Sequence, residues 1–403
     1  MKTRILFVDD ESLALQGLQR LLRHMRTDWE MTFEDSASRA LESMRHTPFD
    51  VVVTDMLMPG MNGAEFLNEV REHYPHTIRL VLSGHAEKEL IFQCLGSAHQ
   101  FLAKPCPPEM LKATLLRISS LNQSMQSNEG LRGSITRMDR FPSVPSLYID
   151  LAETLLNVEV SSTEVTSIVL KDPGVTAATL KTVNSAFFGG PCEISDPADA
   201  LSCLGLDTFK SLAFGWNAFS PFDAPLFKNR ALDLLWHHSV DVAIAAKRIA
   251  EIESADKKTA AAAYVAGLLH DIGKFVMILY AWEQHRQAVA LAKERNVPLG
   301  SAEQEVFGIS HAETGAYLLG LWRLPPAIVD AVSLHHTPIQ ASSSHFNLLT
   351  AVHAANALVA DTRGFAAKTP PPDLDLTYLA QVGLSSRIDA WREALRAEIG
   401  AMC

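Results

Sequence analysis

Short apolar runs and amphipathic segments alternate along the first 120 residues. The apolar runs occupy residues 4–8, 31–33, 51–53, 78–82 and 101–103. After the first run, Leu15, Leu18 and Leu22 fall on one face of a helix, and helical spacing returns after the later runs. Five strand–helix units of this kind predict a doubly wound α/β domain with a parallel sheet over residues 1–120.

The pattern changes to nearly continuous helix from residue 135. Alanine-rich stretches and leucines three or four positions apart predict an all-α helical bundle over 135–362, with sub-bundles at about 135–225 and 226–362. Residues 363–403 are expected to form a Pro-rich linker and a C-terminal helix. Ile388, Trp391 and Leu395 lie on one face of that helix, so this face must pack on something.

Residues 121–134 are polar and predict a linker between the two parts of the chain. Leu111, Ile118 and Met125 are seven positions apart, which indicates that the last helix of the first domain runs on into this linker. Gly130 and Gly133 are expected to end that helix.

Composition limits the class of protein. The chain has 403 residues, a formal net charge of −11 and five cysteines that form no Cys-x-x-Cys pair. The charge argues against a broad DNA-binding surface, and the cysteines favour a reducing, cytoplasmic location. No uncharged apolar stretch reaches the roughly 18 residues of a membrane span. The expected partners therefore include neither DNA nor a membrane.

Polar residues follow four of the five predicted strands: Asp9, Asp10, Asp55, Ser83 and Lys104. Because the carboxyl ends of parallel strands meet at one edge of a sheet, these side chains should converge there. A Mg²⁺ ion would relieve the repulsion among the carboxylates and neutralise an incoming phosphoryl group. Asp55 would then be the nucleophile, with the ammonium of Lys104 and the hydroxyl of Ser83 stabilising the transferred phosphoryl oxygens.

These motifs resemble those of the receiver domains of two-component response regulators, which have a flavodoxin-like fold. The resemblance implies that Asp55 is the phosphoacceptor and that a sensor histidine kinase is the partner. It also implies Mg²⁺ ligands on Asp9, Asp10, Asp55 and the main-chain carbonyl of Leu57. Ser83 and Phe101 would form the switch pair, although phenylalanine offers no hydroxyl where the family often has tyrosine.

The second half carries a different set of motifs. Asp172-Pro-Gly-Val175, Trp236-His-His-Ser239 and the stretch Gly267-Leu-Leu-His-Asp-Ile-Gly-Lys274 stand in the order seen in HD-related output domains, the HDOD family. The chain resembles that family from about residue 135 to residue 360. The resemblance implies a helical fold related to the HD metal-dependent phosphohydrolases, used mostly as a signalling or interaction output.

An HD hydrolase gathers histidines and aspartates around one or two divalent metals. The candidates for such a site, which would be vestigial if inactive, are His238, His270, Asp271, His311, His335, His336 and Asn356. Asn356 stands where HD hydrolases place an aspartate, and a neutral amide weakens a hard-metal site. The chain also lacks the Gly-Tyr-Pro loop of the cyclic-dinucleotide phosphodiesterases after His336.

Three functions stay open for the helical half. The sequence favours a non-catalytic output that meets an unidentified downstream protein or a second copy in a homodimer. One alternative is a phosphohydrolase or phosphodiesterase that uses a divalent transition metal and acts on a nucleotide or cyclic dinucleotide. The other is a nucleotide-binding sensor without turnover. In each, the surface changed by phosphorylation could include Leu111, Ile118 and Met125.

Overall fold

A computed structural model describes residues 2–84, 97–125, 128–138, 145–157, 160–185, 193–215, 230–254, 256–362 and 374–399. Two sequence-based expectations fall outside these ranges: the sub-bundle border near 225 and the Pro-rich linker at 363–373.

The amino-terminal domain is built on a five-stranded parallel sheet in the order β2-β1-β3-β4-β5. Its strands are β1 (Thr3–Val8), β2 (Trp29–Glu34), β3 (Val51–Asp55), β4 (Ile78–Ser83) and β5 (Gln100–Ala103). Its helices are α1 (Ser12–Leu21), the short η1 (Arg23–Thr27), α2 (Ala37–His46), α3 (Gly63–His73) and α5 (Pro108–Ser124). The predicted doubly wound fold is confirmed.

The strand order explains where a site can form. In the sheet, β1 lies between β2 and β3. The chain therefore passes from β1 to its neighbour on one side, β2, and then crosses back over β1 to β3 on the other side. This reversal opens a crevice at the carboxyl ends of β1 and β3, where such sheets bind their ligands. β3 is buried along its whole length, as its run of valines predicts.

Two helices connect the domains, and the first of them, α5, extends past residue 120 into the predicted linker. α5 ends at Ser124, and α6 (Glu129–Arg137) contains both Gly130 and Gly133. The expectation that these glycines end a helix is wrong. Gly133 instead permits close packing, because a Cβ there would lie 2.8 Å from Nδ1 of His76.

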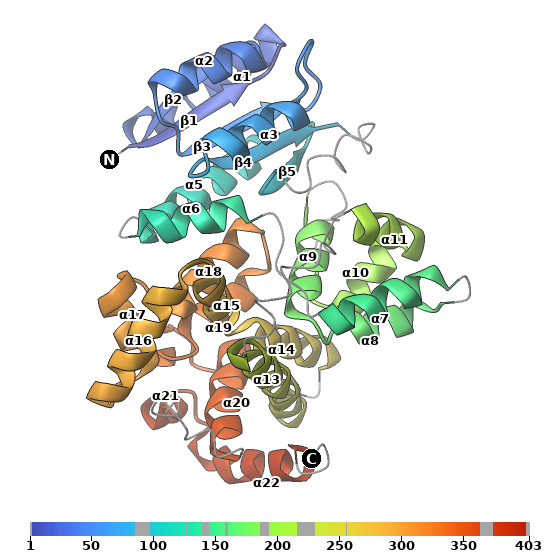
Figure 1. The fold of residues 1–403 in the computed structure, drawn as a ribbon, viewed down its shortest axis with the longest axis vertical. Coiled ribbons are helices and arrows are strands. Elements are labelled where there is room, and N and C mark those ends of the chain that lie inside the picture. The colour runs from blue at the N-terminus through green and yellow to red at the C-terminus, as the bar shows by residue number, and fades with distance from the viewer. Residues whose placement is uncertain are drawn as a thin grey trace.

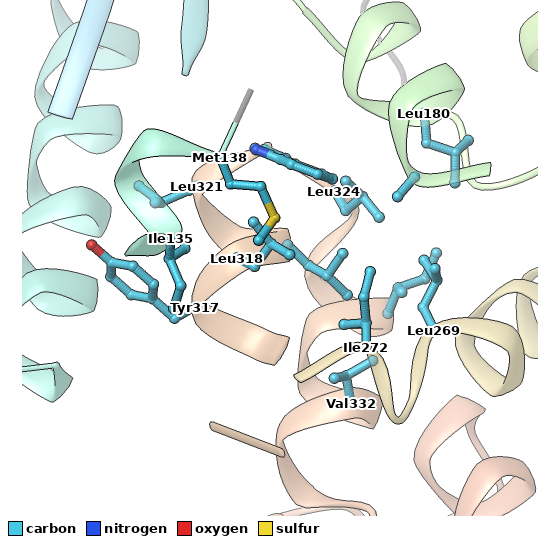
Figure 2. Packing of buried hydrophobic residues seen from close by; sticks show 14 of the residues in the cluster. Ile135, Met138, Leu180, Leu269, Ile272, Tyr317, Leu318, Leu321, Leu324 and Val332 are labelled. Carbon is cyan, nitrogen blue, oxygen red and sulfur yellow. The ribbon is translucent and has the colours of Figure 1, made fainter. Parts of the chain in front are cut away.

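Leu111, Ile118 and Met125 are at most 1% exposed. A protein partner or a second copy therefore cannot touch them while α5 stays in place, and the expectation that they form a changeable surface is wrong in this state. Figure 2 shows Ile135 of α6 and Met138, the residue after this helix, in the same buried cluster as Tyr317 and Leu318 of the helical half. The hydrophobic core is thus continuous from the connecting helices into the helical domain.

Beyond α6, the described residues form helices and the segments that connect them, as predicted. One group comprises α7 (Pro145–Leu156), α8 (Ser162–Val169), α9 (Pro173–Val183), α10 (Pro197–Leu204) and α11 (Leu206–Gly215). The larger group comprises α13 (Arg230–Ser254), α14 (Lys257–Leu269), α15 (Ile272–Tyr280), α16 (Trp282–Arg295), α17 (Leu299–Phe307), α18 (His311–Leu321), α19 (Pro326–Leu334), η2 (Pro338–Gln340) and α20 (Leu348–Thr362). Figure 1 shows α5 and α6 between the sheet and this larger group.

The tail packs on the chain's own core. It consists of α21 (Leu376–Gln381), η3 (Ser385–Arg387) and α22 (Ile388–Ile399), and α22 lies at the end of the molecule opposite the sheet (Figure 1). Trp391 and Leu395 are fully buried, and the indole of Trp391 donates a hydrogen bond of 2.9 Å to Glu253 on α13. The predicted apolar face of the tail helix therefore has an intramolecular partner.

One segment, Lys257–Tyr280, is long and apolar enough to cross a membrane by length and composition, with a mean hydropathy of 1.5. In the structure it forms α14 and α15, and 83% of its apolar window is buried inside the helical domain. Its apolar character is accounted for by core packing.

Candidate functional site

Three carboxylates meet at the carboxyl edge of the sheet. Asp9 and Asp10 follow β1, and Asp55 ends β3; one oxygen from each lies within 4.8 Å of the others. Asp9 and Asp55 are buried, whereas Asp10 is exposed. Oxygen donors in this arrangement suit Mg²⁺, which keeps several waters and takes a few carboxylates.

Lys104 reaches into the same pocket from the loop after β5. Its ammonium lies 3.0 Å from Oδ2 of Asp9 and contacts Oδ1 of Asp55. Burial raises the pKa of Asp55, and the hydrogen bond and charge of Lys104 oppose that rise. Burial would lower the pKa of Lys104, but bonding to Asp55 and Asp9 raises it. The lysine therefore stays cationic beside the predicted nucleophile.

The remaining receiver-like residues surround this pocket. The amide of Leu57 donates to Oδ2 of Asp55 at 3.2 Å, and Ser83 ends β4 with its hydroxyl 3.3 Å from the carbonyl of Gly84. Phe101 is only 3% exposed, so its ring already lies inside the domain. Gly63 is required for the loop, because a Cβ there would lie 2.9 Å from Cα of Met56.

A second cluster forms in the middle of the helical domain, from three helices and two of the segments that connect helices. The candidate residues come from α13 (His238), the α14–α15 turn (His270 and Asp271), the start of α18 (His311), the segment directly after α19 (His335 and His336) and α20 (Asn356). His238 is partly exposed and His336 is exposed, whereas the others are at most 2% exposed. The structure thus brings together all seven residues that the sequence singled out.

Asp271 is the centre of this cluster. Its Oδ2 lies 3.3 Å from Nε2 of His270 and 3.7 Å from Nε2 of His238. Its Oδ1 lies 3.3 Å from Nε2 of His311 and 3.7 Å from Nε2 of His335. Asn356 is connected through His238, whose Nε2 lies 3.1 Å from the amide oxygen.

Close helix packing makes these distances possible. A Cβ on Gly267 would lie 2.9 Å from Cα of Ala243, so only glycine lets α14 approach α13. A Cβ on Gly273 would lie 2.8 Å from the carbonyl carbon of His311 and 2.8 Å from the backbone nitrogen of Gly315. These glycines bring His238 and His311 to the His270-Asp271 turn.

The cluster fits a divalent transition metal. Nε2 of His270, Oδ1 of Asp271 and Nε2 of His335 are buried and make no hydrogen bond with the described residues. Buried polar atoms are seldom left without a partner, and a bound ion can provide one. Imidazole nitrogens with a carboxylate suit manganese, iron or zinc better than magnesium.

The ionisation states favour a metal as well. Burial would raise the pKa of Asp271, but the ammonium of Lys274 and the neighbouring rings of His270 and His311 hold it well below its usual value. Burial lowers the pKa of His335 far below its usual value and that of His238 to about 3. A cation would therefore meet an ionised carboxylate and two neutral imidazoles, the forms that bind metals.

Two residues of the site were missed from the sequence. Lys274 lies one helical turn after Asp271 and pairs with its Oδ2 at 2.6 Å. Glu303 is fully buried and contacts His311. His353, in contrast, is turned away from the cluster: its Nδ1 lies 2.8 Å from the carbonyl of His335 and its Nε2 accepts from the amide of Asp375.

The chain has an α/β domain with an acidic pocket, followed by a helical bundle with a histidine-rich centre. This arrangement is typical of a signalling protein with a receiver domain and an output domain. Residues 5–116 match the response regulator receiver domain, and residues 141–338 match the HDOD domain. The chain therefore belongs to the response regulators, with a receiver domain followed by a helical HDOD output domain.

Individual relatives match one part or the other. An uncharacterized protein of Treponema pallidum is 26% identical over 220 residues, which is 55% of this chain and 42% of that protein. The hydrogenase transcriptional regulatory protein HoxA of Cupriavidus necator is 33% identical over 137 residues, 34% of this chain and 26% of HoxA. The chain thus spans less than half of each of these two relatives.

Among solved structures, an HDOD domain protein from Geobacter sulfurreducens is 26% identical, with a TM-score of 0.37. The match covers 71% of this chain and 98% of that one.

Proposed function

We propose that a partner histidine kinase transfers phosphate to Asp55 and that this phosphorylation controls the HDOD domain. The observation that carries the proposal is the pocket itself, in which Asp55 lies beside two further carboxylates and the ammonium of Lys104. Mg²⁺ on Asp9, Asp10, Asp55 and the Leu57 carbonyl would neutralise the transferred group. Lys104, now paired with Asp55, would move onto the phosphoryl oxygens.

The test is phosphorylation of the full-length protein by a small-molecule acyl phosphate with and without Mg²⁺, followed by intact mass. We expect one added phosphoryl group in the wild type and none in Asp55→Asn. Asp50→Asn is the matched control, because Asp50 lies at the other end of β3 and accepts a hydrogen bond from the amide of Arg4 that asparagine can also accept. Labelling of Asp55→Asn at the wild-type level would refute the assignment.

Two hydrogen bonds join strands of the receiver to the helices beyond it. Arg79 is the second residue of β4, the strand that Ser83 ends, and it donates to the carbonyl of Thr136 on α6 at 2.6 Å. Gln100 at the start of β5 donates to the carbonyl of Leu321 on α18 at 2.9 Å. We infer that a shift of β4 or β5 on phosphorylation changes these contacts, since a phosphate can bias only states with which it interacts differently.

A second candidate function comes from the unsatisfied atoms of the histidine cluster. We propose that His238, His270, Asp271, His311 and His335 hold a divalent transition metal, with Lys274 placed to contact an anionic ligand. The metal would lower the pKa of a bound water and so supply the nucleophile for phosphoester hydrolysis. Asn356 in place of aspartate lowers the negative charge of the site, which favours binding of a nucleotide or cyclic dinucleotide over fast turnover.

The metal content of the purified protein tests this second proposed function. We expect near-stoichiometric manganese, iron or zinc in the purified wild-type protein and loss of it in a His270→Ala, Asp271→Ala double variant. His345→Ala is the control, because His345 is exposed and its ring pairs with the hydroxyl of the neighbouring Ser344. Absence of metal after growth in supplemented medium would leave the HDOD domain as a protein-binding output, with a downstream protein or a second copy as its partner.

A further inference from the structure

Glu303 is a buried carboxylate outside the set of candidate metal ligands. It lies on α17, is fully buried, and faces the start of α18 across a short turn. Its Oε2 accepts a hydrogen bond from the backbone amide of His311 at 2.8 Å and lies 2.5 Å from Nδ1 of the same residue. Its Oε1 is buried and makes no hydrogen bond with the described residues.

This contact fixes the orientation of the imidazole. With Nδ1 bound to a carboxylate, Nδ1 must carry a proton, because the carboxylate is an acceptor only. The other nitrogen, Nε2, then points into the cluster, 3.3 Å from Oδ1 of Asp271 and 3.1 Å from Nε2 of His336. Both ring nitrogens of His311 therefore have a contact: Nδ1 with Glu303, which fixes the orientation of the ring, and Nε2 with the cluster.

The charge of Glu303 has a second consequence. Among the seven candidate ligands, Asp271 is the one carboxylate, and the ammonium of Lys274 at 2.6 Å offsets its charge. Asn356 adds no charge. A divalent cation in this cluster would therefore meet too little negative charge, unless a neighbouring residue supplies more through a ligand.

We propose that Glu303 is a positioning residue that holds His311 with Nε2 toward the metal and supplies the negative charge that Asn356 lacks. This inference rests on the proposed metal-binding function. A carboxylate behind a metal-bound histidine also raises the basicity of the imidazole, and loss of such a partner typically lowers metal affinity 10–100-fold.

The first test measures affinity for Zn²⁺ by titration of the full chain in excess Mg²⁺, which fills the oxygen-rich receiver pocket. We expect Glu303→Gln to weaken Zn²⁺ binding roughly 10–100-fold. Glu305→Gln is the matched control, because Glu305 lies on the same helix but is exposed and pairs with Arg295 at 2.7 Å. Adding Asn356→Asp to Glu303→Gln should recover part of the loss. Equal affinity of wild type and Glu303→Gln would overturn the proposal.

A second measurement needs no metal and separates the two proposals. In ¹⁵N-histidine NMR spectra of the metal-free protein, with His311 assigned by the His311→Gln variant, we expect a hydrogen-bonded proton on Nδ1 that Glu303→Gln loses or shifts. If the wild type binds no Zn²⁺, the proposed metal function is wrong, and the positioning role of Glu303 is then tested by this NMR signal alone. An Nδ1 signal unchanged in Glu303→Gln would overturn the positioning role whether or not metal binds. Thermal unfolding of each variant checks that the fold is retained.

Discussion

Replacement of Gly273 by alanine should separate the two halves of the histidine cluster. The new Cβ would lie 2.8 Å from both the carbonyl carbon of His311 and the backbone nitrogen of Gly315, and closer still to the His311 carbonyl oxygen. Ordinary van der Waals contact begins at 3.4 Å, so α15 and α18 must move apart by at least about 0.6 Å. The obstacle is backbone on both sides, which no rotamer change can relieve.

The expected cost is about 1–3 kcal/mol or somewhat more, the usual range for overpacking a close contact. For a domain of this size, that lowers the unfolding midpoint by roughly 2–4 °C per kcal/mol. Because His311 and Asp271 lie on the two displaced elements, Zn²⁺ affinity should fall as well. Gly300→Ala is the control: its Cβ would lie 3.9 Å from the nearest atom, Cβ of Ser310. If Gly273→Ala unfolds and binds Zn²⁺ like the control, the packing explanation is wrong.

Three further outcomes follow from buried contacts. Burial lowers the pKa of His285 to about 4, below its unfolded value near 6.5. The protein should therefore lose roughly 3 kcal/mol of stability through this histidine as the pH falls from 6.5 to 4. In His285→Gln, the unfolding midpoint should fall less steeply over the same pH range. Gln100→Ala leaves the Leu321 carbonyl without its donor and should cost about 1–3 kcal/mol, seen in calorimetry as wider separation of the receiver and HDOD transitions. Trp391→Ala should cost about 3–5 kcal/mol in denaturant unfolding, and Trp391→Phe less, because phenylalanine loses mainly the bond to Glu253.

The receiver could be predicted from the sequence because each of its parts leaves a local mark. A strand buried on both faces is a run of valines, and the residue after it lies at the edge of the sheet by geometry alone. The positions of Asp9, Asp55 and Lys104 follow from those two rules. The orientation of the Phe101 ring could not be predicted, because the sequence is the same whether the ring points into the domain or out of it.

The histidine cluster was only partly predictable. Neighbouring histidines and the His270-Asp271 pair identified its members, but their convergence depends on helix contacts across more than one hundred residues, which spacing cannot give. Glu303 left a faint signal, since it shares the buried face of its helix with Phe307, one turn later. The prediction for Gly133 was wrong because a glycine that ends a helix and one that admits a neighbour look alike in sequence.

The positions of the two domain contacts restrict how the protein can be switched. Arg79 and Gln100 hold the output domain at the amino-terminal ends of β4 and β5, while Asp55 lies at the carboxyl edge. The six residues of β4 span roughly 20 Å and the four residues of β5 span less, so these two contacts lie away from the acidic pocket at the other end of the strands. On the proposed function, we expect a kinase to reach Asp55 while these contacts stay in place, and we expect phosphorylation to affect the output through β4 and β5. Variants that loosen Gln100 should accordingly leave phosphorylation intact and uncouple it from any change in the HDOD domain; a loss of phosphorylation in Gln100→Ala would contradict this order of events.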